Sequence, residues 1–222
     1  GSLVSEFPLH PGAWPIGLAG VASFAGGDSL AELGVLWINT ANGGKRIQVK
    51  QLDGTSTGTQ NIPIQIMPLA LEGVPDCCGG ASDEVSALGW DRLADRLRLR
   101  TVEASGGLVQ DGTFGNRGQA IALRRVPNFG GSSADELVTL FRNPALRAAV
   151  RGRDAMTGAN LLVKGYGPVA GSVPLGLGVS PSVYDTVADE VSVYWLDPAT
   201  GDLFVTVRDA GSGSIVANVP IP

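Results

Sequence analysis

Apolar and polar residues alternate near the C-terminal end of the chain. Val191, Val193 and Trp195 occupy every second position of one run, and this period of two predicts a β-strand. The next segment, 197–201, reads Asp-Pro-Ala-Thr-Gly, in which Pro presets the turn and Gly takes a left-handed conformation. A second alternating run over 203–208 then completes a predicted β-hairpin.

The same pattern occurs four times along the chain. Three landmarks keep one register in every copy: a glutamate, a valine and an aromatic residue. These landmarks are Glu32, Glu84, Glu136 and Glu190; Val21, Val74, Val126 and Val179; and Trp37, Trp90, Phe141 and Trp195. Successive glutamates are 52, 52 and 54 residues apart. A period near 50 residues predicts a repeat architecture.

Each copy is expected to contain about four short strands. A short strand precedes each hairpin, at 16–21, 69–74, 121–126 and 175–179, and a further strand follows it, most clearly at 62–66 and 215–221. The third copy is degenerate, because its segment 145–153 is also compatible with a short helix. Long amphipathic helices are not expected.

This pattern predicts an all-β fold, a four-bladed β-propeller in one domain. The approximate repeats are 15–67, 68–119, 120–173 and 174–222, with 8–14 closing the ring. Closure is expected because the end of copy one, Asn-Ile-Pro-Ile, recurs as Asn-Val-Pro-Ile at the end of copy four. The start of the chain can then follow its end, which would hide the terminal strand edges. The alternative is a barrel or sandwich of paired hairpins.

Charge is distributed unevenly along the 222 residues. The net charge is −5, but the segment from Arg92 to Arg153 holds eleven arginines and five acidic residues. A partner-binding or polyanion-binding surface is therefore predicted there, at Arg96, Arg98, Arg100, Arg147 and Arg151. The alternative, which we favour, is that this basic segment and the acidic remainder of the chain face neighbouring subunits or water.

Few residues could support catalysis. His10 is the one histidine, and nothing near it resembles a nucleophile motif, so a triad is not expected. The two cysteines, Cys77 and Cys78, are adjacent and occupy the place of aromatic residues in the other copies, which favours apolar packing over redox chemistry. The Gly-rich stretches are not followed by helices, so phosphate cradles are not expected.

The repeated glutamates are the candidate metal site. In a closed ring, Glu32, Glu84, Glu136 and Glu190 would converge, and four carboxylates could hold a hard cation such as Ca2+. The alternative is that each glutamate begins a strand and bonds backbone amides of the adjacent loop. Repetition favours this alternative, since repeats preserve structural residues first.

The tryptophans divide into two groups. Trp37, Trp90 and Trp195 lie in the repeat register and are expected to pack in the core. Trp14 lies outside that register, so it is the candidate for stacking against a glycan.

The segment 36–40, Leu-Trp-Ile-Asn-Thr, with its Gly turn and return strand, resembles a hairpin of bacteriophage tail-fibre and neck proteins. The segment 194–209 resembles it too. The resemblance covers about twenty residues each time and implies a structural or host-binding role in a virion without catalysis. It transfers no site residues.

The predicted function is a non-enzymatic structural or adhesive module of a larger assembly, such as a phage particle. The alternative is a glycan-binding lectin, and a hydrolase is a weaker alternative. Protein neighbours are the expected partners, a glycan is an additional candidate, and neither a nucleic-acid partner nor a membrane span is expected. A virion or extracellular location is favoured.

Overall fold

The computed structural model describes residues 11–22, 24, 32–75, 82–103, 107–115, 119–127, 129, 135–142, 148–155, 157–166, 171–183 and 188–222. Four residues singled out from the sequence, His10, Cys77, Cys78 and Arg147, lie outside these ranges.

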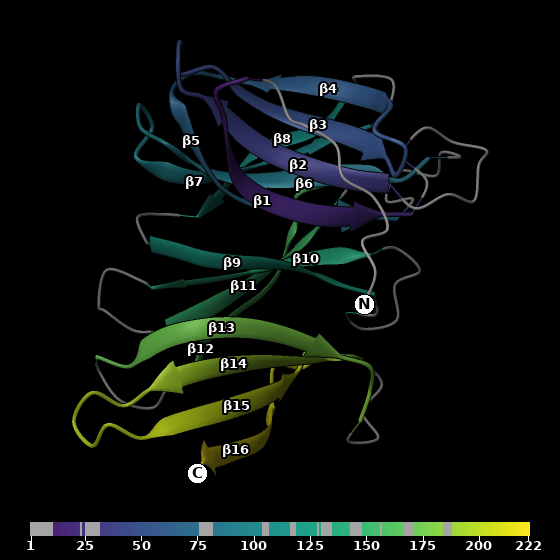
Figure 1. The fold of residues 1–222 in the computed structure, drawn as a ribbon. Helices are drawn as coiled ribbons and strands as arrows, with labels where there is room; N and C mark the ends of the chain where they lie inside the picture. Colours follow the sequence, from purple (N-terminus) through teal and green to yellow (C-terminus); the bar gives the residue numbers. More distant parts are fainter. Residues whose placement is uncertain are drawn as a thin grey trace. The chain divides into compact units, whose positions relative to one another are not determined.

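Within these ranges, sixteen antiparallel strands form four sheets of four strands each (Figure 1). The first sheet contains β1 (Ala13–Val21), β2 (Glu32–Asn39), β3 (Lys45–Gln51) and β4 (Ser56–Ile62). The second contains β5 (Ile66–Val74), β6 (Glu84–Asp91), β7 (Arg96–Val102) and β8 (Leu108–Gly115). The third contains β9 (Gln119–Val126), β10 (Glu136–Arg142), β11 (Ala148–Asp154) and β12 (Asn160–Tyr166). The fourth contains β13 (Val173–Ser180), β14 (Glu190–Leu196), β15 (Leu203–Asp209) and β16 (Ile215–Ile221).

Strands that are consecutive in sequence are neighbours in every sheet, so the prediction of an all-β fold built from four similar sheets is confirmed. The described part of the chain contains no helix that could span a membrane.

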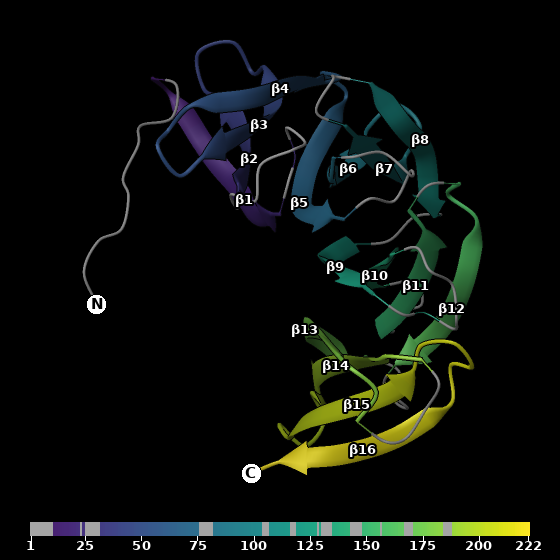
Figure 2. The same cartoon turned by 90° about the vertical axis from the view of Figure 1, so that its right-hand side faces the viewer.

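The chain divides into two compact units, residues 1–114 and 115–222, with two sheets in each. In the first unit, β1 and β5 lie side by side, and one face of the first sheet packs on the second (Figure 2). In the second unit, β9 and β13 do the same, and the third sheet packs on the fourth (Figure 2). Each unit therefore has its own apolar core between two sheets.

The first strand of each sheet carries a β-bulge at the same place. One residue is skipped in the pairing with the next strand, and it is a large apolar residue each time: Ile16, Leu69, Ile121 and Leu175. A bulge bends a strand and increases its local twist. The fourfold repeat in the sequence is thus also a repeat of backbone irregularity.

A second structural feature recurs in the hairpin turns. In four turns an Asn or Asp is followed four residues later by a glycine with positive φ, at Gly43, Gly158, Gly201 and Gly213. The amide of each glycine donates to the carbonyl oxygen of the Asn or Asp at 2.8–3.0 Å. Asp95 takes the same place after Asp91 and also has positive φ, 52°.

Two details differ from the sequence-based expectations. The segment 145–153, for which a short helix was left open, forms most of β11, because Ala148 and Val150 are buried in the core of the second unit. Burial and ladder pairing with β10 outweigh the helix propensity of alanine. The outer strand of the first sheet is β4 at 56–62, since the amide of Ile66 donates to the carbonyl oxygen of Pro63 and closes a turn there.

Candidate functional site

The four repeated glutamates are buried at the first position of β2, β6, β10 and β14. One carboxylate oxygen of Glu32 accepts a hydrogen bond from the backbone amide of Phe24, and one of Glu190 accepts from the amide of Val183 at 2.9 Å. Both bonds reach back to the loop that precedes the strand. In these two copies the glutamate therefore begins a strand and holds the adjacent loop through a backbone amide, which was the alternative to metal binding.

Within the described ranges, no group of three or more His, Cys, Asp or Glu side chains could hold a metal ion. The cation site formed by all four glutamates, and with it the Ca2+ hypothesis, stays a prediction.

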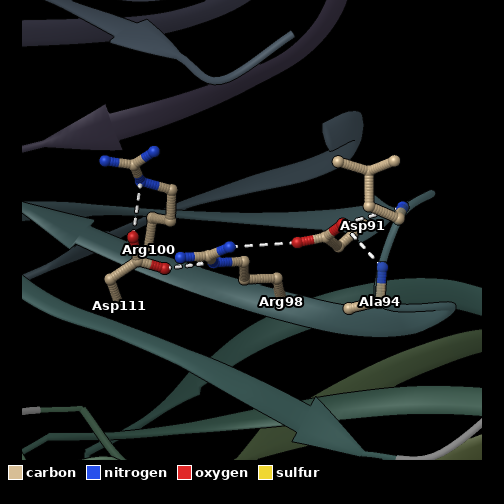
Figure 3. Close-up of polar contacts among 6 residues, drawn as sticks. Asp91, Ala94, Arg98, Arg100 and Asp111 are labelled. Atoms are coloured by element: carbon tan, nitrogen blue, oxygen red, sulfur yellow. Dashed lines mark hydrogen bonds and ion pairs between the residues drawn. The ribbon is translucent and has the colours of Figure 1, made fainter. Parts of the chain in front are cut away.

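Two arginines of β7, Arg98 and Arg100, form a polar network with two aspartates (Figure 3). Alternation along β7 places Leu97 and Leu99 in the protein interior and the arginines on the opposite face. Arg98 donates through Nη1 to Oδ2 of Asp91 at 3.0 Å and through Nε to Oδ1 of Asp111. Nε of Arg100 lies 3.6 Å from the other oxygen of Asp111 (Figure 3). The network joins the end of β6, the middle of β7 and β8.

Asp91 also organises the turn between β6 and β7. Its Oδ1 accepts the backbone amides of Leu93 and Ala94, at 3.0 and 3.1 Å. The bond from Ala94, followed by the contacts with Arg98 and Leu93, lowers the pKa of Asp91 despite its burial. The hydrogen bond to Asp111 and then the one to Asp91 raise the pKa of Arg98. Both side chains are therefore fixed in their charged forms.

The structure brings together only part of the predicted arginine surface. Arg98 and Arg100 share Asp111, while Arg96 is exposed at the start of β7, opposite Asp91. Arg151 lies on β11 in the third sheet, where its guanidinium is 5.9 Å from the ring centre of Phe141 and burial lowers its pKa.

The tryptophans also lie in different environments. Trp37 and Trp195 are buried, as expected, and Trp90 is half-buried. The indole N–H of Trp195 donates to Thr206 Oγ1 at 2.9 Å, and its ring stacks on Phe204 with centroids 4.6 Å apart. Trp14, the glycan candidate, is 66% exposed on β1.

Trp14 does not stand alone at its edge of the first unit. Strand pairing brings the start of β1, the end of β4 and the end of β6 to the same side of the first unit, where these strands begin or end. We refer to this side, formed by strand ends and turns, as an edge of the unit. Ile64 and Leu93, in the turns after β4 and β6, are 72% and 85% exposed. We call Trp14, Ile64 and Leu93 the Trp14 edge.

Two polar contacts tie the turns of this edge together. The amide of Arg92 donates to the carbonyl oxygen of Gln65 at 3.1 Å, and Nζ of Lys45 donates to that of Ile64. Burial, and then the charge of Arg92, lower the pKa of Lys45, so these two cations lie close to each other. Ile64, Leu93 and Lys45 were not among the site residues predicted from the sequence. The available signal was the presence of large apolar residues inside turns.

No protein-family model matches the chain, and no curated protein matches it. Solved structures do match. The Dos1 propeller is 15% identical with a TM-score of 0.60, over 94% of this chain and 47% of that one. A triple mutant of AofleA from Arthrobotrys oligospora is 15% identical with a TM-score of 0.54, over 93% and 57%. A rhamnogalacturonan lyase from Bacillus licheniformis is 12% identical with a TM-score of 0.52, over 91% and 50%.

These similarities confirm the prediction of a propeller fold, and the four four-stranded sheets fit a four-bladed propeller. The chain spans about half the length of the solved chains that it matches. One of those proteins is named as a lyase, so the fold by itself does not separate enzymes from non-enzymes. A tail fibre of a Staphylococcus aureus phage also matches, but its TM-score of 0.23 carries no argument about the fold.

Proposed function

We propose that this chain is a non-enzymatic module that acts through its surface, as a structural or adhesive component of a larger assembly such as a phage particle. A virion or extracellular location goes with this role. The Trp14 edge is the observation that carries the proposal, because three large apolar side chains are exposed at one edge of a single unit.

Covering an apolar edge of this kind with a partner is favourable in free energy, because apolar surface is removed from water. Scattered exposed apolar residues are ordinary on a protein surface, but a group of them indicates an interaction site. Tryptophan is also among the residues that contribute most to binding at interfaces. Covering the exposed part of Trp14, about 130 Å², would contribute about 3 kcal/mol of apolar burial.

The polar residues that repeat support a structural interpretation. Glu32 and Glu190 hold loops, and Asp91 holds a turn and an arginine. These carboxylates form hydrogen bonds that stabilise loops and turns of the protein itself. This use favours a scaffold over a hydrolase, in which carboxylates would act on a substrate.

The genes that flank the coding sequence test the class of assembly. Capsid or tail genes are the expected neighbours, and an operon of metabolic enzymes would contradict the proposal. Once a particle is identified, incorporation of Trp14→Ser/Leu93→Ser should fall relative to the wild type. Leu52→Ser, at an exposed residue in the β3–β4 turn, is the matched control and should be incorporated normally.

Glycan binding is the second candidate, and the same edge supports it. An exposed indole offers a flat apolar face for stacking against a sugar ring. A glycan array followed by tryptophan fluorescence tests this candidate. Quenching that disappears in Trp14→Ala would support it, whereas no quenching by any arrayed glycan would count against it.

The arginine surface and the cation site have simple tests of their own. Asp91 and Asp111 neutralise much of the charge at Arg98 and Arg100, so we expect heparin binding to be weak and lost at moderate salt. Calcium that stabilises the fold should raise the melting temperature, and a chelator should reverse the change. An unchanged melting temperature would remove the Ca2+ hypothesis.

A further inference from the structure

Two cationic residues meet at one turn of the first unit. Lys45 begins β3 and donates through Nζ to the carbonyl oxygen of Ile64, in the turn between β4 and β5. The backbone amide of Arg92 donates to the next carbonyl oxygen along that turn, the one of Gln65, at 3.1 Å. All four residues belong to the unit 1–114, so these contacts lie within one compact unit.

Neither cation is paired with an acidic group in the part of the chain that the structure describes. Lys45 is buried, with 8% of its surface exposed, and Nζ uses one of its three donors there. Arg92 is exposed, and its guanidinium makes no hydrogen bond or ion pair with the described residues. The charge of Arg92 adds to burial in lowering the pKa of Lys45. A buried cation without a counter-charge is unfavourable, so an anion bound here would stabilise the site.

The charged residues next to the pair in sequence have other partners. Both carboxylate oxygens of Asp91 are engaged, since Oδ1 accepts two backbone amides of its own turn and Oδ2 accepts from Arg98. Arg46 follows Lys45 along β3, so it lies on the opposite face of the strand, with its guanidinium 5.6 Å from the ring centre of Trp37. The chain therefore supplies no neighbouring carboxylate to the two cations.

Apolar side chains flank the two cations. Ile64, which provides the carbonyl group for Lys45, is 72% exposed, and Leu93, which follows Arg92, is 85% exposed. We propose that Lys45 and Arg92 bind one carboxylate of the protein partner that covers the Trp14 edge. Apolar groups beside this carboxylate contact Ile64 and Leu93. This inference rests on the proposed function, because it names the chemistry of the partner at the same edge.

The two cations suit a carboxylate for different reasons. The planar guanidinium of Arg92 can donate two parallel hydrogen bonds to a carboxylate, and the ammonium of Lys45 has donors to spare. A polar ring beside the carboxylate would lose hydration against Ile64 and Leu93, whereas an apolar group would bury apolar surface there.

Small carboxylates test the site without the partner. Acetate, hexanoate and glucuronate are titrated separately into the full isotope-labelled chain at constant ionic strength, and the amide resonances are followed by NMR. We expect saturable shifts at the amides of Ile66, Arg92 and Leu93. Hexanoate should bind about fourfold more tightly than acetate for each methylene that contacts the protein. Glucuronate, whose carboxylate lies on a polar ring, should bind no more tightly than acetate.

Variants assign the binding to the two cations. Lys45→Met and Arg92→Gln should each weaken hexanoate binding by about tenfold or more. Lys50→Met is the matched control, because Lys50 is as buried as Lys45 on the same strand but donates to the carbonyl oxygen of Gly54, at the other end of β3. Its hexanoate affinity should equal that of the wild type. Leu93→Ser should reduce the advantage of hexanoate over acetate and leave acetate binding unchanged. Methionine keeps the apolar stem of lysine, so Lys45→Met should not melt below the wild type.

Several outcomes would overturn the proposal. Shifts that do not saturate, or that persist unchanged in Lys45→Met, would remove the site. An equal loss in Lys50→Met would show a general effect of charge. Glucuronate that binds more tightly than hexanoate would replace the apolar protein partner with an acidic glycan. The titrations need no assembled particle, so their failure leaves the incorporation test of the Trp14 edge unchanged, and normal incorporation of Trp14→Ser/Leu93→Ser would refute the proposed function separately.

Discussion

Left-handed glycines in the hairpin turns allow a clean test of the backbone geometry. Gly43 and Gly201 have φ of +69° and +80°, and a Cβ built at either residue would meet no atom within 4 Å. Alanine at these positions therefore creates no steric overlap with neighbouring residues. Its cost comes from the left-handed conformation itself, which an L-residue adopts at a cost of about 1–2 kcal/mol.

The unfolded chain reduces this cost. Alanine has fewer unfolded conformations than glycine, which stabilises the folded state by about 0.4–1 kcal/mol. We expect Gly201→Ala and Gly43→Ala to lower the free energy of unfolding by about 1 kcal/mol each, or about 2–4 °C in melting temperature for a chain of this length. Urea unfolding followed by tryptophan fluorescence and circular dichroism measures the change.

Gly20→Ala is the matched control. Gly20 lies on β1, is exposed, does not have a positive φ, and has equally open space around its Cβ position. At Gly20 the substitution only reduces the number of unfolded conformations. The variant should therefore be more stable than the wild type by about 0.4–1 kcal/mol. If Gly201→Ala proved as stable as Gly20→Ala, the turn at 201 would not be left-handed in solution and the reasoning would be refuted.

Three further changes probe other features. A Cβ at Gly73 would overlap the carbonyl oxygen of Gly20, so Gly73→Ala should cost about 1–3 kcal/mol in urea unfolding; a neutral result would mean that β1 and β5 are further apart. Because the pKa of Asp91 is lowered in the folded state, its charge stabilises the fold above the unfolded value of 3.8, and this contribution is lost as pH falls through the folded pKa. Asp91→Asn should therefore be less stable than the wild type at pH 7, and the difference should shrink below pH 4; a difference that does not vary with pH would exclude the ionic contribution. Thr206→Val removes the acceptor of the buried Trp195 indole and should cost about 1–3 kcal/mol with a shift in fluorescence, whereas an unchanged spectrum would contradict the bond.

Local chemistry explains which parts of the fold were predictable. The hairpins at 33–50 and 191–208 combine alternation with an Asn or Asp and a left-handed glycine, and both signals act within a few residues. The strand β4 was misplaced because its residues are mostly polar and it pairs on one side only. The strand β11 was ambiguous because its alanines favour a helix until a neighbouring sheet buries them.

The candidate sites were less predictable for a related reason. Alternation placed Arg98 on the face of β7 opposite its leucines, but the two aspartates that neutralise it come from other strands. Trp14 was identified as exposed because it falls outside the repeat. Ile64 and Leu93 join it only after the strands are paired.

The sequence by itself determined the number of repeats, the strand and turn pattern within each, and the residues that every copy needs. The strand and turn pattern depends on contacts between residues near one another in the chain, so a single copy already contains that information, and the number of copies follows from comparing the four along the chain. Tertiary structure decided which equivalent positions differ in environment. Trp37 and Trp90 are the aromatic landmarks of their repeats, yet Trp37 is buried and Trp90 is only half-buried. The physical reason is that burial depends on the neighbouring sheet, which no periodicity within one copy can specify.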